Sequence, residues 1–334
     1  MTHLRLSVSV ERFALKVPFV ISRGTKTHAV VVAVSLSDGR VTGRGECTPY
    51  ARYGETPENV VAEIEALAAR ADVLGSRNVA AAREALAAAV KPGAARNALD
   101  CALWDYEAKV SGVSVAQRLG FDASMAVETC FTLSLGSPEA MAIAAREAQG
   151  HRLLKLKLGG AGDIERMAAV RHARPDARLV ADANEAWTDD MVGPFLAAAD
   201  ESGFELVEQP LPVDADDILE GLMCSVPVCA DESAHTTADV RGLIGRYEAV
   251  NIKLDKAGGL TEALAMSAAA KAAGFRVMIG SMVATSLAVA PAFALASGAD
   301  WVDLDGPLLL AEDRDPPAQF ADGLIRPPPS RLWG

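Results

Sequence analysis

The feature that most constrains this chain is a series of charged residues spaced by about one strand plus one helix. The series consists of Lys157, Asp182, Glu208, Asp231 and Lys253, at intervals of 25, 26, 23 and 22 residues. Each residue lies at or near the end of a short apolar run, just before a loop-like segment. In a barrel of parallel strands, the loops after the strands form one face, where catalytic groups gather. The spacing therefore predicts a parallel barrel with an active site at that face.

The first third of the chain predicts a separate α+β domain over residues 1–115. Its strands come first and its helices second, which is typical of this class rather than of alternating folds. The expected strands and the expected Ala-rich helices span residues 4–12, 29–37 and 41–47 (strands) and 57–71, 78–90 and 94–109 (helices).

From about residue 126, strands alternate with helices. Eight strands are expected, at residues 127–135, 152–158, 178–182, 205–208, 227–231, 249–254, 276–280 and 301–305. Helices are expected between them, for example at 138–149, 162–173, 189–202, 259–273 and 284–297. This order predicts a modified (β/α)7β barrel of the TIM type over residues 116–310. The Pro-rich segment 311–334 is expected to pack back on the first domain.

Composition limits the classes of partner. The 334 residues, 50% of them hydrophobic, suffice for a large barrel and a smaller domain. The net charge of -12 disfavours nucleic-acid or anionic-membrane partners. The longest apolar stretch, residues 282–296, contains Pro291 and is shorter than the roughly 20 residues of a membrane span. With no signal-peptide pattern at the N-terminus, we expect a cytoplasmic protein with a small-molecule substrate, which could form homo-oligomers.

Strand periodicity decides which charged residues face into the barrel, because residues two apart share a face. In LLKLKLGG, residues 153–160, the alternate leucines would pack under the outer helices. Lys155 and Lys157 would then point inward. The same parity points Lys253 inward and Lys256 outward, if the strand continues regularly to Lys256.

The three acids of the series predict a metal site. Asp182, Glu208 and Asp231 would converge from adjacent strands, where three carboxylates without a cation repel one another. A hard divalent cation removes this penalty, and ligation by oxygen alone favours Mg²⁺ over zinc. Any one acid alone would more often cap a loop or pair with a surface lysine. All three at consecutive strand ends favour one bound Mg²⁺, for which Mn²⁺ could substitute.

The inward lysines suit proton transfer at a carbon atom. Burial and nearby positive charge lower the pKa of a lysine from its usual value of about 10.4. Both conditions are expected at Lys157, beside Lys155 and the metal. Two bases on opposite sides of a substrate can remove a proton from one face of a carbon and return it to the other. The metal would stabilise the enolate charge that develops meanwhile.

Through these residues the chain resembles the enolase superfamily, muconate-lactonising subgroup, over nearly its whole length. The segments that carry the resemblance are KLK, DANEAW, EQPLP, ADES and NIKLDKAGG. A Lys or His base with one or two Mg²⁺ ions is the known arrangement of this superfamily, so that pairing is not an independent prediction. The roles that the resemblance implies are Mg²⁺ ligation by Asp182, Glu208 and Asp231, opposed acid/base catalysis by Lys157 and Lys253, assistance at the substrate carboxylate by Lys155, and support around the ligands by Asn184 and Glu232.

A narrower resemblance, to the L-Ala-D/L-Glu epimerases of that subgroup, rests on DLDGPLLL in the last barrel strand. Asp303 and Asp305 share one face there, and in dipeptide epimerases this D-x-D motif binds the free ammonium group of the substrate. Two carboxylates at the mouth attract an amine and repel an acidic substrate arm. The segments PFVISRGTKTHAVVV and GECTPYARYGETP also match, and in the family they close over the substrate.

Within these closing segments, Arg23 is the residue expected to bind the side-chain carboxylate of the substrate. Arg52 and Tyr53 are weaker candidates, because exposed loop residues are more often solvated surface groups. Further residues expected to line the pocket are Thr132 on the first barrel strand and Ser281 and Met282 on the seventh.

The implied function is a Mg²⁺-dependent epimerase acting on the α-carbon of the C-terminal residue of a dipeptide. L-Ala-Glu is the expected substrate and murein-peptide recycling the expected role. Other reactions on this fold belong to cycloisomerases, o-succinylbenzoate synthases and N-acyl amino acid racemases, whose substrates carry no ammonium for Asp303 and Asp305. More distant alternatives are a metal-free Schiff-base lyase or aldolase, and a dipeptide-binding scaffold, which would have no need of two inward lysines. The breadth of dipeptide specificity stays open.

Overall fold

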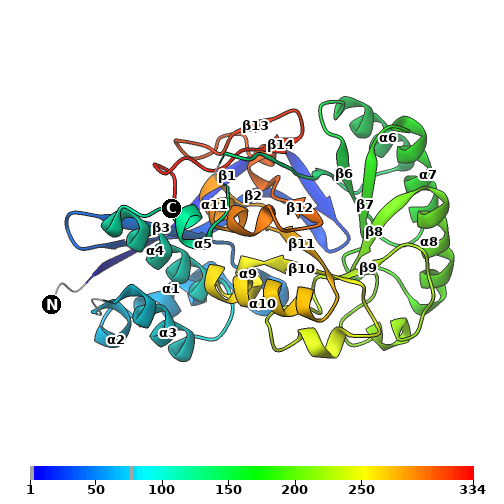
Figure 1. The fold of residues 1–334 in the computed structure, drawn as a ribbon. Coiled ribbons are helices and arrows are strands. Elements are labelled where there is room, and N and C mark those ends of the chain that lie inside the picture. Colours follow the sequence, from blue (N-terminus) through cyan, green and yellow to red (C-terminus); the bar gives the residue numbers. More distant parts are fainter. Residues whose placement is uncertain (1–3, 76–77, 123) are drawn as a thin grey trace.

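The computed structural model describes residues 4–75, 78–122 and 124–334 (Figure 1). In this part of the chain the first domain contains a three-stranded antiparallel sheet, in the order β1 (Arg5–Ile21), β2 (Gly24–Ser37) and β3 (Thr42–Cys47). The helices that follow are α1 (Pro57–Glu65), α2 (Ala71–Leu74), α3 (Val79–Ala89), α4 (Ala94–Ser111) and α5 (Val115–Leu119). A short 3-10 turn, Ala51–Tyr53, lies between β3 and α1. We call β1 to α4 the capping domain.

The β1–β2 hairpin is longer than the alternation at residues 4–12 and 29–37 predicted. Beyond residue 14 its register shifts, and its far end pairs Phe19 with Lys26. The hairpin arm lies against the barrel instead of the capping-domain helices: Leu15 forms a bridge with Leu310. The strands therefore extend through contacts with a distant part of the chain. The alternation of polar and apolar residues along each strand does not reveal these contacts.

The second part of the chain is a barrel, as predicted. The described residues form a parallel sheet of eight strands in sequential order from β5 to β12. These are β5 (Phe131–Leu133), β6 (Leu153–Lys157), β7 (Arg178–Asp182), β8 (Phe204–Glu208), β9 (Val228–Ala230), β10 (Ala249–Lys253), β11 (Arg276–Gly280) and β12 (Trp301–Asp303). The helices between them are α6 (Pro138–Glu147), α7 (Asp163–Ala173), α8 (Asp189–Glu201), α9 (Leu254–Ala257), α10 (Leu260–Ala272) and α11 (Ser286–Ala296). After β8 and β9 the connections contain only 3-10 turns, Asp216–Leu219 and Val240–Leu243.

The predicted strand at 127–135 is divided between two sheets. Its first part, β4 (Val127–Glu128), pairs with β14 (Leu324–Ile325), which pairs in turn with β13 (Phe320–Ala321). Only β5 belongs to the barrel. The chain end then reaches α4, where the indole N–H of Trp333 donates to the Cys101 carbonyl at 3.0 Å.

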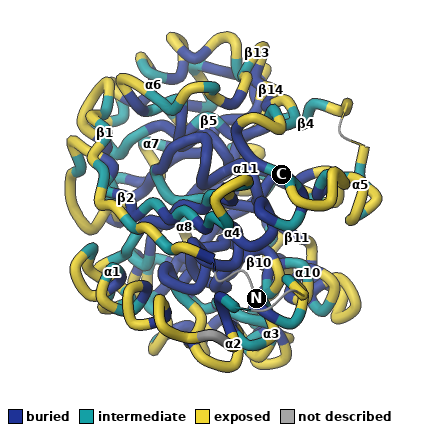
Figure 2. Tube along the Cα trace, turned by 90° about the vertical axis from the view of Figure 1, so that its left-hand side faces the viewer, coloured by how far each residue is buried: buried dark blue, intermediate teal, exposed yellow. Residues whose placement is uncertain are grey.

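Inside the barrel, a layer of apolar side chains is followed by a layer of mostly charged and polar side chains. One layer of apolar side chains fills its lower part: Cys130, Leu153, Val180, Leu206, Cys229, Ala249, Met278 and Trp301. Because side chains two apart share a face, the next inward layer consists of Lys155, Asp182, Glu208, Asp231, Asn251 and Asp303. The alternate leucines of β6 face the outer helices and join the main core. Figure 2 shows the buried residues concentrated along the central strands, with exposed ones on the periphery.

Helix α11 accounts for the longest apolar stretch of the sequence. All of its 11 residues are buried. It makes contacts with β3 of the capping domain as well as with β11 of the barrel. Among the described residues there is no helix with the length and apolarity needed to cross a membrane.

Candidate active site

The charged series lies at the carboxyl ends of adjacent barrel strands. Strand register places Lys157 beside Asp182, and Asp182 beside Glu208. Asp231 directly follows β9, and Lys253 ends β10. In the barrel order β6 and β10 are separated by β7, β8 and β9, so the two lysines approach from opposite sides.

Each acid of the series pairs with a lysine. Lys155 Nζ lies 2.6 Å from Glu208 Oε2, and 2.7 Å from Asp303 Oδ2. Lys157 Nζ donates to Asp182 Oδ2. Lys253 Nζ lies 2.6 Å from Asp231 Oδ2. The structure therefore brings the predicted bases and the predicted ligands into one connected network.

Lys256 belongs to this network, although parity predicted that it points outward. The strand ends at Lys253 and α9 begins with the next residue. The helical turn directs Lys256 Nζ to Asp231 Oδ1, at 2.6 Å, and to the Asn251 carbonyl, at 2.9 Å. The prediction was wrong because period two applies only while the strand continues.

Burial and the density of charge shift the pKa values of these groups. Burial, with the carboxylate of Asp182 beside it, raises the pKa of Glu208 to about 7. Burial would also raise the pKa of Asp231, but Lys253 and Lys256 hold it well below its usual range. Burial opposes the charge on Lys253, yet Asp231 and Glu208 keep its pKa above the usual range. The repulsion that raises the pKa of Glu208 is the penalty that a bound cation would relieve.

The acids fit a hard divalent cation by their chemistry, since they offer oxygen donors only. Among the described residues no three His, Cys, Asp or Glu side chains already form a metal cage. In this structure the ammonium group of Lys157 pairs with Asp182, and that of Lys253 pairs with Asp231 and lies 3.8 Å from Glu208. These ammonium groups supply the positive charge that the acids need.

The D-x-D motif lies across the pocket. Asp303 ends β12 and Asp305 follows it, with Asp305 Oδ2 accepting the Thr132 N–H at 2.6 Å. Burial, followed by the charge of Asp303, raises the pKa of Asp305 to about 7. Asp303 Oδ1 is buried and has no hydrogen-bond partner among the described residues. An acceptor of this kind is costly unless a ligand satisfies it.

The capping domain closes the site through the turn between β1 and β2. Arg23 Nη2 lies 2.6 Å from Glu232 Oε1 and donates to the Tyr50 hydroxyl at 2.8 Å, and Nη1 lies 3.1 Å from Glu185 Oε2. Arg52 also pairs with Glu185, at 2.7 Å. Glu185 thus joins two capping-domain segments to the loop after β7.

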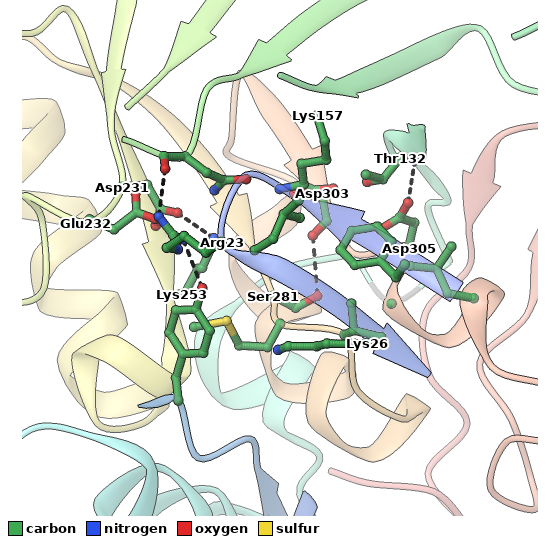
Figure 3. A pocket seen from close by; sticks show the side chains of 18 of the residues that line it. Arg23, Lys26, Thr132, Lys157, Asp231, Glu232, Lys253, Ser281, Asp303 and Asp305 are labelled. Carbon is green, nitrogen blue, oxygen red and sulfur yellow. Dashed lines mark hydrogen bonds and ion pairs between the residues drawn. The ribbon is translucent and has the colours of Figure 1, made fainter. Parts of the chain in front are cut away.

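The pocket is lined by residues of both domains (Figure 3). The predicted residues that line it are Arg23, Tyr53, Thr132, Lys157, Asn184, Asp231, Glu232, Lys253, Ser281, Met282, Asp303 and Asp305. Beneath them, fully buried, lie Lys155, Asp182 and Glu208. Arg52 is bound to Glu185 outside the lining.

Several residues of the site escaped the sequence analysis, among them Lys26, Asn251 and Lys256. Lys26 lines the pocket, Asn251 donates to Glu208 Oε1 at 2.8 Å, and Lys256 holds Asp231. The inward parity of Asn251 was visible in the sequence. For Lys256 no local signal existed, because the strand ends at Lys253. The position of Lys26 depends on the hairpin arm beyond residue 14, where the register of β1 and β2 shifts.

Comparison with known families agrees with this geometry. Residues 4–120 match the mandelate racemase / muconate lactonizing enzyme N-terminal domain, and residues 139–331 match the enolase C-terminal domain-like family. The chain belongs to the enolase superfamily. The resemblance seen in its motifs is thereby confirmed.

Two relatives in this superfamily are similar over almost their whole length. The L-Ala-D/L-Glu epimerase of Escherichia coli strain K12 is 43% identical over 320 residues, which cover 95% of this chain and 98% of that one. The N-acetyl-D-glutamate racemase of a Pseudoalteromonas species is 41% identical over 304 residues, covering 91% and 95%.

Solved structures of superfamily members share the fold. An Agrobacterium tumefaciens enolase family member with homology to dipeptide epimerases, solved with sodium and L-Ala-L-Glu, superposes with a TM-score of 0.95. It is 50% identical, and the match covers 99% of this chain and 100% of that one. The dipeptide epimerase of Enterococcus faecalis, complexed with Mg and L-Leu-L-Tyr, has a TM-score of 0.89 at 29% identity, covering 98% and 97%.

Proposed function

We propose that this chain is a dipeptide epimerase that inverts the α-carbon of the C-terminal residue, with L-Ala-Glu as its substrate. The observation that carries the proposal is the pair of lysines on opposite sides of one pocket, with two aspartates at a third side. The relatives that act on L-Ala-D/L-Glu support the choice of substrate. Recycling of murein peptides in the cytoplasm would be the corresponding role.

Proton transfer is assigned to Lys157 and Lys253. One amine removes the α-proton from its face of the substrate, and the ammonium group on the other side delivers a proton to the opposite face. Because the lysines come from β6 and β10, a planar intermediate between them is accessible from both sides. Positioned acid/base groups of this kind contribute about 10²–10⁴-fold to a rate.

Asp182, Glu208 and Asp231 would hold one Mg²⁺. The structure of the Enterococcus faecalis relative, which contains Mg and a dipeptide, supports this choice of ion. Bound there, the ion would supply electrostatic stabilisation of the negative charge that develops on the substrate carboxylate. Lys155, bound to Glu208 and Asp303, would hold these acids in place from beneath.

Asp303 and Asp305 would bind the ammonium group of the substrate. The unpartnered Asp303 Oδ1 supports this role, since an ammonium offers the donor that it lacks. The ion pair would fix the α-carbon between the two lysines.

Epimerisation is tested by incubation of L-Ala-L-Glu in deuterated water with Mg²⁺. We expect deuterium at the α-carbon of Glu, detected by mass and by NMR, and formation of the L,D epimer. Lys157→Ala and Lys253→Ala should each lose epimerisation by about 10²–10⁴-fold. Each variant should still exchange the epimer whose proton faces the remaining lysine. Full activity in either variant would refute the two-base scheme.

The similarity to an N-acetyl-D-glutamate racemase favours one second candidate, racemisation of N-acylated amino acids. Such substrates carry no ammonium for the D-x-D motif. Comparing kcat/KM for L-Ala-L-Glu and N-acetyl-glutamate decides between the two. A metal-free Schiff-base enzyme would keep its activity in EDTA and form a borohydride-trapped lysine adduct, whereas a scaffold would bind dipeptide without exchange.

A further inference from the structure

The connections after β8 and β9 contain 3-10 turns where the barrel pattern would place helices. A buried cluster of polar side chains joins these two connections to each other. At its centre is Gln209, which is fully buried and directly follows the predicted ligand Glu208. The predicted ligand of the next strand, Asp231, directly follows β9. Two of the three predicted metal ligands therefore lie on the parts of the chain that this cluster connects.

The Gln209 side chain holds the backbone of Asp231. Its Oε1 accepts the Asp231 N–H at 2.8 Å and the Ser233 N–H at 3.1 Å. The pairing of β8 with β9 ends at Glu208 and Cys229, so Asp231 lies beyond the ladder. In a parallel ladder that continued, a main-chain carbonyl of β8 would accept the Asp231 N–H. Here the side-chain oxygen of Gln209 takes that place.

The partners of the Gln209 amide determine its orientation. Its Oε1 faces two N–H donors, and its Nε2 donates to the Leu211 carbonyl at 2.9 Å. Nε2 also lies 2.9 Å from Ser233 Oγ and 3.0 Å from the Tyr247 hydroxyl. A flipped amide would place a donor against two donors. Both polar atoms are therefore committed to protein groups, and Gln209 acts on the site through the residues that it holds.

Asp216 anchors the far side of the cluster. Its Oδ2 accepts the Ser233 hydroxyl at 2.6 Å and the Tyr247 hydroxyl at 2.7 Å, and its Oδ1 pairs with Arg246 at 2.5 Å. Bonds thus run from the 3-10 turn after β8, through the segment before β10, to Gln209. A buried polar network whose members are satisfied is rigid. The acceptor that faces Asp231 is therefore fixed in place.

The backbone of Gln209 is strained. Its φ of +36° lies in the left-handed region, which residues other than glycine rarely adopt. The Gln209 N–H donates to the Cys229 carbonyl at 2.8 Å, and its carbonyl accepts the Glu185 N–H at 2.9 Å. These bonds to the neighbouring strand ends hold the conformation. Backbone strain that the surroundings maintain in this way is concentrated at functional sites.

We propose that Gln209 is a positioning residue that holds Asp231 in place relative to Glu208, so that both can bind one Mg²⁺. This assignment rests on the proposed Mg²⁺ site. Because Glu208 and Gln209 are consecutive, the bond to the Asp231 N–H ties both ligands into one unit. Lys253 and Lys256 hold the carboxylate of Asp231, whereas Gln209 holds its backbone. Ligands that are held before binding lose less freedom when the cation enters.

The test measures Mg²⁺ binding by isothermal titration calorimetry, on protein freed of metal and without substrate. Gln209→Met keeps the length of the side chain and removes its acceptor. It should weaken Mg²⁺ binding by about 10- to 100-fold, the usual effect of losing a group that supports a metal ligand. Gln209→Glu keeps an oxygen that accepts both N–H groups, and should therefore retain most of the affinity.

Tyr247→Phe is the matched control. It removes a hydroxyl from the same cluster and leaves the bonds from Gln209 to the Asp231 and Ser233 N–H groups. Its urea midpoint without Mg²⁺ should fall, as that of Gln209→Met should, but its Mg²⁺ affinity should stay close to that of the wild type. This comparison separates the positioning of a ligand from a general loss of stability.

Unchanged Mg²⁺ affinity in Gln209→Met, or equal losses in Gln209→Met and Tyr247→Phe, would overturn the positioning role. A wild-type protein that binds no Mg²⁺ would overturn the proposed metal site, and the Gln209 assignment with it. Because binding is measured without substrate, a failure to exchange dipeptides would refute the epimerase proposal and leave this test valid. If circular dichroism shows that Gln209→Met is unfolded, Gln209→Asn, whose amide is too short to reach Asp231, answers the same question.

Discussion

Lys155 stays charged although it is buried, because three carboxylates lie close to its ammonium group. Its side chain is fully buried, and burial alone would lower its pKa; Asp303, Glu208 and Asp182 instead raise it well above its usual range. A buried ammonium with three carboxylates within reach stays charged. The motif suggested contact with the substrate, whereas the structure places Lys155 beneath the pocket. It links the predicted metal ligands to the D-x-D motif.

Asp305 should make substrate binding depend on pH. Its pKa is raised to about 7, so the carboxylate is present above that pH and is lost as the pH falls through it. The α-amino group of a peptide is protonated below about 8. We expect the KM for L-Ala-L-Glu to be lowest between these values and to rise about tenfold per pH unit below 7. Steady-state kinetics from pH 5.5 to 9 measure this.

Asp305→Asn provides the control for that profile. The variant should have a higher KM throughout and lose the rise at acidic pH. A KM of the wild type that does not change between pH 8 and pH 6 would contradict the role of Asp305 in ammonium binding.

Helix α4 packs closely against strand β3 in the capping domain. The strand presents glycines to the helix: a Cβ on Gly45 would lie 2.0 Å from the Ala98 carbonyl oxygen, and one on Gly43 2.2 Å from that of Ala102. Because both obstacles are helix backbone, neither can move aside as a flexible side chain would. The absence of a side chain at Gly43 and at Gly45 is what lets α4 pack against this strand.

Gly45→Ala should therefore destabilise the protein. Inserting a methyl group into a close-packed contact costs about 1–3 kcal/mol or more, and urea unfolding followed by fluorescence would measure it. Gly242→Ala is the control, because Gly242 is exposed and a Cβ there meets no atom within 4 Å. Equal stability of the two variants would show that α4 can shift away from β3.

The two domains are joined by buried polar contacts. Asp255, at the start of α9 in the barrel, accepts the Thr48 N–H at 3.0 Å and the Asn97 side-chain amide at 2.8 Å, both from the capping domain. Arg96 of α4 donates to the Ala257 carbonyl at 2.6 Å. These contacts set the position of the hairpin that carries Arg23 and Lys26 relative to the barrel mouth.

Asp255 should make stability depend on pH. Burial raises its pKa to about 7, above the value of about 3.9 in an unfolded chain. The folded state then binds this proton more strongly, so its contribution to the free energy of unfolding is present below about pH 4 and is lost as the pH rises to about 7.

Asp255→Asn keeps the acceptor for Thr48 and Asn97 without a charge. Relative to wild type, the variant should gain stability between pH 5 and pH 8, by on the order of 3 kcal/mol for a shift of this size. Urea midpoints at the two pH values give the comparison. Parallel pH profiles of the two proteins would show that Asp255 does not titrate in this range.

Prediction from sequence succeeded where the signal was local. The order of strands and helices predicted the α+β domain and the barrel, and the parity of KLK placed Lys155 and Lys157 on the inner face. It failed at residues 127–135, where β4 leaves the barrel to pair with β14 near the chain end. It failed again at Lys256, one helical turn after β10.

The amino-acid sequence alone determined the succession of elements, the inward face of each strand and the oxygen chemistry of the acids. All three can be read from the types of residue and their spacing within short stretches of sequence. Only the tertiary structure decided which charges balance each other: that Lys256 holds Asp231, and that Arg23 is already paired with Glu232 and Glu185. The reason is physical: such pairs join segments far apart in the chain, and their geometry exists only once the barrel closes and the hairpin lies over it.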